Sequence, residues 1–232
     1  MLKIANHFLY KHPLPDGHRF PMIKYELLPL QLLYEGIACE NNFFEPAIIS
    51  EEDILAVHTK DYWLKLKRLN LSKQEIRVTG FPLSYQLVKR EMHIAQGTID
   101  ASLYALKYGC AMNIAGGTHH AFSYKGEGFC LLNDQAIAAQ FLINKNLSSK
   151  VLIIDLDVHQ GNGTAEIFKE NDQVFTFSMH GSKNYPFKKE LSDLDVPLED
   201  GINDTEYLDL LYHHVPKLID NVKPDFVFYL SG

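Results

Sequence analysis

A chain of 232 residues, with 46% hydrophobic and 22% charged residues, has the composition of an ordinary globular protein and is long enough for one large α/β domain. The net charge of −7 argues against a nucleic-acid partner, because general binders of phosphate backbones usually carry a basic surplus. It is compatible with a cationic partner such as a lysine side chain or a polyamine. No apolar run approaches the ~20 residues of a membrane-spanning helix, and the N-terminus lacks the apolar segment of a signal peptide, so we expect a cytoplasmic protein without a membrane partner.

The three cysteines, Cys39, Cys110 and Cys130, are widely spaced, odd in number and form no C-x-x-C pair. This pattern does not predict a disulfide framework and favours a reducing compartment. We expect Cys130 to be a buried thiol, since nothing in its sequence context activates it as a nucleophile.

The first part of the chain is predicted to be mainly helical. Residues Lys24–Tyr34 are apolar with helical spacing, although Pro29 predicts a kink or a break. Ser50 followed by acidic residues is typical of a helix start. Residues Tyr85–Tyr108 predict a long helix that ends at Gly109, where a glycine cap is expected.

From residue 111 onward, short apolar runs alternate with helical patterns. The run KVLIID is rich in β-branched residues, which is typical of a strand buried on both faces. The alternation predicts βαβ units in a single domain, residues 1–232, with a parallel sheet flanked by helices on both faces. Ligands of such sheets bind beyond the carboxyl ends of the strands. The predicted strands are residues 111–115, 150–155, 173–178 and 225–230, and the predicted helices are residues 134–144, 164–169 and 205–219.

Asp155, Asp157 and His159 follow the predicted buried strand 150–155. The period-two alternation of a strand places the three side chains on one side. Two carboxylates and an imidazole that converge there need a cation or hydrogen-bond donors, and both groups are suitable zinc ligands. The alternative is that one aspartate caps the next helix and His159 is an ordinary loop residue. The complete D-x-D-x-H pattern, followed by residues 161–163 (GNG), favours the metal site.

His119 and His120 follow a pair of glycines at another predicted strand end. Near a metal, two histidines can supply a base for an attacking water and an acid for a leaving amine. Each needs a partner for its other ring nitrogen, and Asp155 and Asn162 are candidates. A histidine pair by itself indicates little, however. His213-His214 lies mid-helix without a flanking signal, and we assign that pair to the surface or the core.

Two further loops hold candidate residues of lower weight. In residues 126–134 (GEGFCLLND), Asn133 or Asp134 is a plausible N-cap of the next helix. Phe129 in that loop can line an apolar tunnel, although such a residue is more often part of a core. Arg19 lies in a proline-flanked loop and, taken alone, is an ordinary solvated residue.

Together these segments resemble the histone deacetylase superfamily, which includes acetoin-utilisation and acetylpolyamine amidohydrolase-like bacterial enzymes. The combination of GG-x-HH, GFC-x-x-ND and D-x-D-x-H-x-G-N-G is highly specific, and HQGNG and HRFPM resemble the class IV branch and its bacterial relatives. The resemblance covers nearly the whole chain. It implies an arginase/deacetylase-like fold and zinc-dependent hydrolysis of an acetylated lysine peptide or an acetylated small amine. The matching stretches are HRFPMIKY, GGTHHAF, GEGFCLLND, VLIIDLDVHQGNGTAEIF, FSMH and PLEDGINDTEYL.

The resemblance also implies a role for each candidate residue. His120 would be the general base, oriented by Asn162, and His119 would be its electrostatic or general-acid partner, held by Asp155. The other implied roles are Asp157 and His159 as ligands of Zn²⁺ (with Fe²⁺ as the alternative metal), the Gly128 carbonyl as acceptor of the substrate amide N–H, Phe129 and Tyr185 as walls of the acyl-lysine tunnel, Arg19 in an internal acetate channel, and Asp155 with Ser178 in a structural K⁺ site.

The sequence departs from the family pattern at its end. The family's third zinc ligand, an aspartate, and its transition-state tyrosine would follow the LSG with which this sequence ends. We therefore expect a version of a longer deacetylase that is incomplete at its C-terminal end, with the last strands missing. The alternatives are a catalytically impaired binding module for acyl-lysine and a fragment without a function of its own. The sequence also leaves open whether the protein forms a homo-oligomer in which a partner subunit covers the sheet edge.

Overall fold

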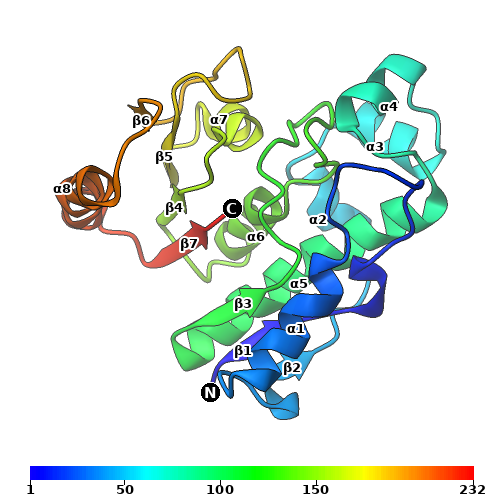
Figure 1. The fold of residues 1–232 in the computed structure, drawn as a ribbon, viewed down its shortest axis with the longest axis horizontal. Coiled ribbons are helices and arrows are strands. Elements are labelled where there is room, and N and C mark those ends of the chain that lie inside the picture. The colour runs from blue at the N-terminus through cyan, green and yellow to red at the C-terminus, as the bar shows by residue number, and fades with distance from the viewer. The chain divides into compact units, whose positions relative to one another are not determined.

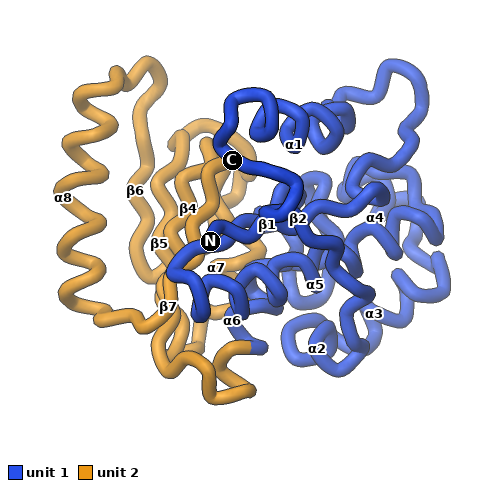
Figure 2. Tube along the Cα trace, turned by 90° about the horizontal axis from the view of Figure 1, so that it is seen from below, with its two compact units in different colours: residues 1–141 blue, residues 142–232 orange.

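The computed structural model describes residues 1–232, which form two compact units, residues 1–141 and residues 142–232 (Figure 2). Each unit contains a parallel sheet with helices packed beside it (Figure 1). The predicted α/β class with parallel sheets and flanking helices is confirmed. The single domain over residues 1–232 stays a prediction. None of the helices is both long and apolar enough to cross a lipid bilayer.

The first unit is built around a three-stranded parallel sheet in the order β2–β1–β3. The long helix α5 packs against β1 and β3. The strands are β1 (Lys3–Ala5), β2 (Phe43–Phe44) and β3 (Ala111–Asn113), and the helices are η1 (Phe8–Tyr10), α1 (Lys24–Tyr34), η2 (Glu40–Asn42), α2 (Glu51–Leu55), α3 (Lys60–Lys67), α4 (Lys73–Thr79) and α5 (Tyr85–Tyr108), with α6 (Asp134–Asn144) running on into the second unit.

Helix α5 has the bounds that its sequence predicts. The Ser84 hydroxyl accepts the backbone N–H of Leu87 at 3.1 Å, and Gly109 ends the helix with φ +89°, a conformation that glycine adopts without steric cost. Helix α1 also forms with the predicted bounds. Of the two predicted effects of Pro29, a kink or a break, the break is wrong. The helix continues through the proline, which is one of its two buried residues, so packing outweighs the missing hydrogen bond.

The second unit contains a four-stranded parallel sheet in the order β6–β5–β4–β7. Strand β6 is absent from the sequence-based prediction, because LDVPL lies in a polar segment and contains Pro197. A proline is tolerated there because β6 is an edge strand. The elements are β4 (Val151–Asp155), α7 (Asn162–Phe168), β5 (Val174–Gly181), β6 (Leu194–Leu198), α8 (Asp204–Val222) and β7 (Phe226–Leu230).

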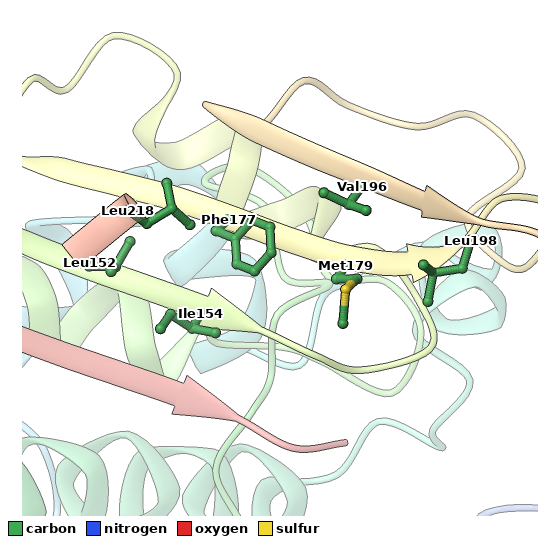
Figure 3. Close-up of a cluster of buried hydrophobic side chains, with 7 residues drawn as sticks. All are labelled: Leu152, Ile154, Phe177, Met179, Val196, Leu198 and Leu218. Carbon is green, nitrogen blue, oxygen red and sulfur yellow. The ribbon is translucent and has the colours of Figure 1, made fainter. Parts of the chain in front are cut away.

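Helix α8 covers one face of this sheet and α7 lies on the other (Figure 1). The α8 face holds a buried apolar cluster to which β4 contributes Leu152 and Ile154, and the burial of each such side chain contributes about 1.5–3 kcal/mol. Strand alternation therefore directs Asp155 to the opposite face. All five residues of β4 are buried, as the sequence predicts. The cluster consists of Leu152, Ile154, Phe177, Met179, Val196, Leu198 and Leu218 (Figure 3).

Candidate active site

In the first unit, Asp134 anchors the loop that carries the two adjacent histidines. Its carboxylate accepts the backbone N–H groups of Gly117 at 3.0 Å and Thr118 at 2.8 Å, and the Thr118 hydroxyl at 2.6 Å. Asp134 is only 1% exposed, so these charge-assisted hydrogen bonds replace its hydration. Asp134 is the first residue of α6, so the loop is fixed to this helix at Thr118, the residue immediately before His119.

The glycine pair in this loop serves the same contact. An added Cβ at Gly116 would lie 2.7 Å from the Asp134 carboxylate, and Gly117 has φ +87°. The helix cap is also decided, since the Asn133 side-chain oxygen accepts the backbone N–H of Ala136 at 3.0 Å. Asn133 is therefore the N-cap, and Asp134 is left to hold the loop.

His119 and His120 are both buried, with ring centroids 4.1 Å apart. Behind them, the backbone N–H of Ala121 bonds to the Thr118 carbonyl at 3.3 Å, and the Asn133 amide donates to the Ala121 carbonyl at 3.1 Å. The pair therefore lies in a loop that is fixed on both sides, which restricts the orientation of both rings.

A third histidine, His58, supports this region and is missing from the sequence-based prediction. Its Nδ1–H donates to the Phe122 carbonyl at 3.0 Å, and its Nε2 accepts the backbone N–H of Asn133 at 3.0 Å. The ring is 2% exposed, and burial lowers the pKa of His58 to about 4. It is therefore a neutral imidazole of one tautomer that joins the loop after His120 to the start of α6. A lone histidine in LAVHTK gives no signal of this role.

Gly128 and Phe129 form a tight two-residue turn. Both have positive φ, +54° and +68°, and Glu127 pairs with Cys130 on either side through hydrogen bonds of 3.0 and 2.9 Å. A two-residue hairpin turn with positive φ at both central positions is normally occupied by glycine, asparagine or aspartate. A phenylalanine at the second position is therefore unusual. The backbone N–H of Phe129 donates to the Thr79 carbonyl at 2.7 Å, so the turn is held against the end of α4.

The half-buried Phe129 ring lies in an aromatic cluster. Its centroid is 5.1 Å from those of Phe20 and Phe81, and the Arg19 guanidinium lies 4.9 Å from it. This contact places a cation over a ring face, a favourable arrangement. Arg19 is exposed, and its predicted role in an internal channel stays a prediction.

In the second unit, Asp155, Asp157 and His159 form a continuous series of contacts after β4. The Asp155 carboxylate accepts the backbone N–H of Asp157 at 3.0 Å, and Asp157 accepts the backbone N–H of His159 at 2.7 Å. Asn162 begins α7 and is buried. Ser178 is the register partner of Asp155 on the neighbouring strand β5. The predicted strand alternation through Asp157 and His159 is wrong, because β4 ends at Asp155 and residues 157–159 lie in a bend. The two side-chain-to-backbone hydrogen bonds, rather than the pleat of a strand, bring these polar groups together beyond the carboxyl end of β4.

Asp157 and His159 have the chemistry of a divalent metal site. Asp157 Oδ1 lies 2.8 Å from His159 Nδ1, and the side chains are 17% and 41% exposed. Carboxylate oxygen and imidazole nitrogen are donors that zinc prefers. The structure contains no group of three His, Cys, Asp or Glu side chains that could hold a metal ion. Asp157 and His159 therefore offer a metal ion two protein ligands. The residues present therefore fit zinc in type.

The half-buried Tyr185 lies next to this pair. Its ring centroid is 6.2 Å from that of His159, with the two planes at 71°. It belongs to the segment between β5 and β6. The predicted tunnel residue is therefore placed beside the predicted metal ligand, within one unit.

Comparison with known proteins identifies the family. The histone deacetylase domain matches residues 18–232, across both units. A cyanobacterial protein of uncharacterised function, from Picosynechococcus, is 43% identical over 99% of this chain and 76% of its own length. The chain belongs to the histone deacetylase family.

Other histone deacetylase relatives are more distant and longer. Histone deacetylase 2 of Arabidopsis thaliana is 30% identical over 93% of the chain, and acetoin utilization protein AcuC of Staphylococcus aureus is 28% identical over 97%. The chain spans 58% and 63% of the lengths of these two proteins.

Solved structures of histone deacetylase homologues share the fold. A homologue crystallised in complex with SAHA superposes with a TM-score of 0.83 at 26% identity, over 98% of this chain and 67% of that one. The homologue from Aquifex aeolicus gives a TM-score of 0.82 at 25% identity, with the same coverage. The fold of this chain is therefore that of the histone deacetylases.

Proposed function

We propose that this histone deacetylase domain takes part in the zinc-dependent hydrolysis of an N-acyl amide, either an acetylated lysine side chain or an acetylated small amine. The observation that carries the proposal is the Asp157–His159 pair, with Oδ1 and Nδ1 2.8 Å apart at the end of a buried strand. Membership in a family that includes deacetylases supports it.

Asp157 and His159 would hold the metal, with ferrous iron as the alternative. A bound zinc ion supplies Lewis acidity toward the acyl carbonyl and the attacking water. His120 would take the proton of that water, oriented by Asn162, and His119, held by Asp155, would stabilise charge and pass a proton to the leaving amine. The fixed loop around the two histidines favours proton transfer, because it limits their motion.

We assign the Gly128 carbonyl to the substrate amide N–H and the rings of Phe129 and Tyr185 to the walls of the acyl-lysine tunnel. The rigid turn at Gly128 and the aromatic cluster behind Phe129 support this role, because both fix one wall. A similar HDAC homologue was crystallised in complex with SAHA, which supports a ligand site in this fold. Asp155 and Ser178, register partners in β4 and β5, are the proposed potassium site.

The test combines metal analysis with an acetyl-lysine peptide assay. We expect His120→Ala to abolish turnover while zinc content is unchanged, because His120 is not assigned to the metal. Asp157→Asn should lower zinc content and turnover together, because Asp157 is one of the two residues that are assigned to it. His213→Ala, at an exposed histidine in α8, is the control and should change neither. Turnover retained by His120→Ala would contradict the assignment. Peptide binding without metal and without product would instead indicate a non-catalytic acyl-lysine module.

A further inference from the structure

The segment that carries Tyr185 is tied to the chain on both sides of His159. We name residues 182–193 the β5–β6 loop. Just before it, the backbone N–H of Gly181 donates to the Val158 carbonyl at 2.9 Å. Near its end, Glu190 is bonded to Gln160. Val158 and Gln160 are the two chain neighbours of His159, so the loop is held against the residue that we assign to the metal.

The Gln160 side chain bonds to Glu190 through both the nitrogen and the oxygen of its carboxamide group. Its Nε2 donates to the Glu190 carbonyl at 2.7 Å, and its Oε1 accepts the Glu190 backbone N–H at 2.9 Å. The same Nε2 donates to the Asp195 carboxylate at 2.8 Å. Gln160 is 1% exposed, so water cannot easily replace these bonds.

The partner of this amide, Asp195, is fixed in turn. Its other carboxylate oxygen accepts the backbone N–H of Ser192 at 2.9 Å, which closes the end of the loop. Inside the loop, the Lys189 ammonium donates to the carbonyls of Asn184 and Pro186, both at 2.6 Å. These carbonyls flank Tyr185. The position of its ring therefore depends on bonds that lead back to Gln160.

We propose that Gln160 is a positioning residue that holds the Tyr185 ring beside His159 and so determines how tightly the acyl substrate is bound. The inference rests on the proposed function, which makes Tyr185 a wall of the substrate tunnel. We do not assign Gln160 to direct contact with the substrate or the metal. It acts through the β5–β6 loop.

A glutamine is suited to this place because an amide both donates and accepts. Gln160→Glu keeps the size and the acceptor but loses both donor bonds and sets a carboxylate against Asp195. Gln160→Asn keeps the amide but shortens the side chain by one methylene. The matched control is Gln31→Glu, the same change at an exposed glutamine of α1 that bonds only to Glu35 four residues away.

The experiment measures hydrogen exchange of residues 182–193 in the purified protein, together with zinc content and steady-state kinetics on an acetyl-lysine peptide. For Gln160→Glu we expect exchange in the loop to rise about tenfold or more, since buried hydrogen bonds are lost. Zinc content should be unchanged. KM should rise several-fold more than kcat falls, and combining the change with Tyr185→Ala should add little further effect on KM. Gln31→Glu should leave all of these values unchanged.

Unchanged exchange in Gln160→Glu and Gln160→Asn would overturn the proposal, whatever the activity. Raised exchange with an unchanged KM would also overturn it, because the loop would then not govern substrate binding. Exchange needs neither substrate nor metal. If the protein hydrolyses nothing but Gln160→Glu still raises exchange in the loop, the result contradicts the proposed function. It still supports the conclusion that Gln160 holds the β5–β6 loop.

Discussion

The carboxylate of Asp134 lies 2.8 Å from the backbone nitrogen of Thr118, one residue before the histidine pair. The sequence places these two residues sixteen positions apart, in a strand-end loop and at a helix start. Thr118 returns the contact, since its hydroxyl accepts the backbone N–H of Asp134 at 3.0 Å. This reciprocal arrangement makes the first turn of α6 the support of the candidate catalytic loop.

Removal of the Asp134 carboxylate should therefore damage both stability and function. In Asp134→Ala, the backbone N–H groups of Gly117 and Thr118 lose a buried acceptor, so the free energy of unfolding should fall by about 3 kcal/mol or more. Any deacetylase turnover should fall with it, because His119 and His120 lose their support. Urea denaturation and the peptide assay measure the two effects. Asp61→Asn, an exposed acidic residue in the first turn of α3, serves as the control.

Gly80 gives a test of the aromatic wall. An added Cβ there would lie 2.7 Å from the Phe129 ring, and Gly80 has φ +81°. Gly80→Ala should lower the free energy of unfolding by about 1 kcal/mol for the strained φ alone, and should raise KM by displacing Phe129. Gly36→Ala is the matched control, because Gly36 has φ +69° with open space around its Cβ position. It should show the loss of stability without the change in KM. Equal KM values for the two variants would argue against Phe129 as a substrate wall.

His58 predicts a pH dependence of stability. Burial lowers its folded pKa to about 4 from 6.5, so the unfolded chain binds more protons between these values. The His58 contribution is fully present above pH 6.5 and is lost as the pH falls toward 4, at most roughly 3 kcal/mol. Urea denaturation at pH 8, 6 and 5 should show this fall. His58→Gln should be less stable at pH 8 but should have a shallower slope below pH 6.5. An unchanged slope in that variant would assign the pH dependence to other groups.

Periodicity and caps predicted most of the local structure. Tyr85–Tyr108 and Asp134–Asn144 form as helices with the predicted bounds, because their apolar spacing and terminal caps act over a few residues. The strand at Lys150–Asp155 was predicted from its β-branched run, and β4 occupies Val151–Asp155. The sequence does not predict strand β6, since this edge strand contains a proline and an aspartate and has no apolar run.

In the candidate site, too, local sequence patterns predicted some features, and others depended on contacts between distant segments. The sequence by itself predicted a polar cluster of Asp155, Asp157 and His159, because the D-x-D-x-H pattern follows a buried strand and the chemistry of the three side chains indicates a metal. Strand alternation does not hold them, since β4 ends at Asp155 and backbone bonds to the two carboxylates shape the segment that follows. Tertiary structure alone decided the supports. Asp134 meets Thr118, His58 meets Asn133, and Gln160 meets Glu190 across 16, 75 and 30 positions. Such pairs depend on which loops the sheet brings together, and no local pattern of spacing or hydrophobicity records that meeting.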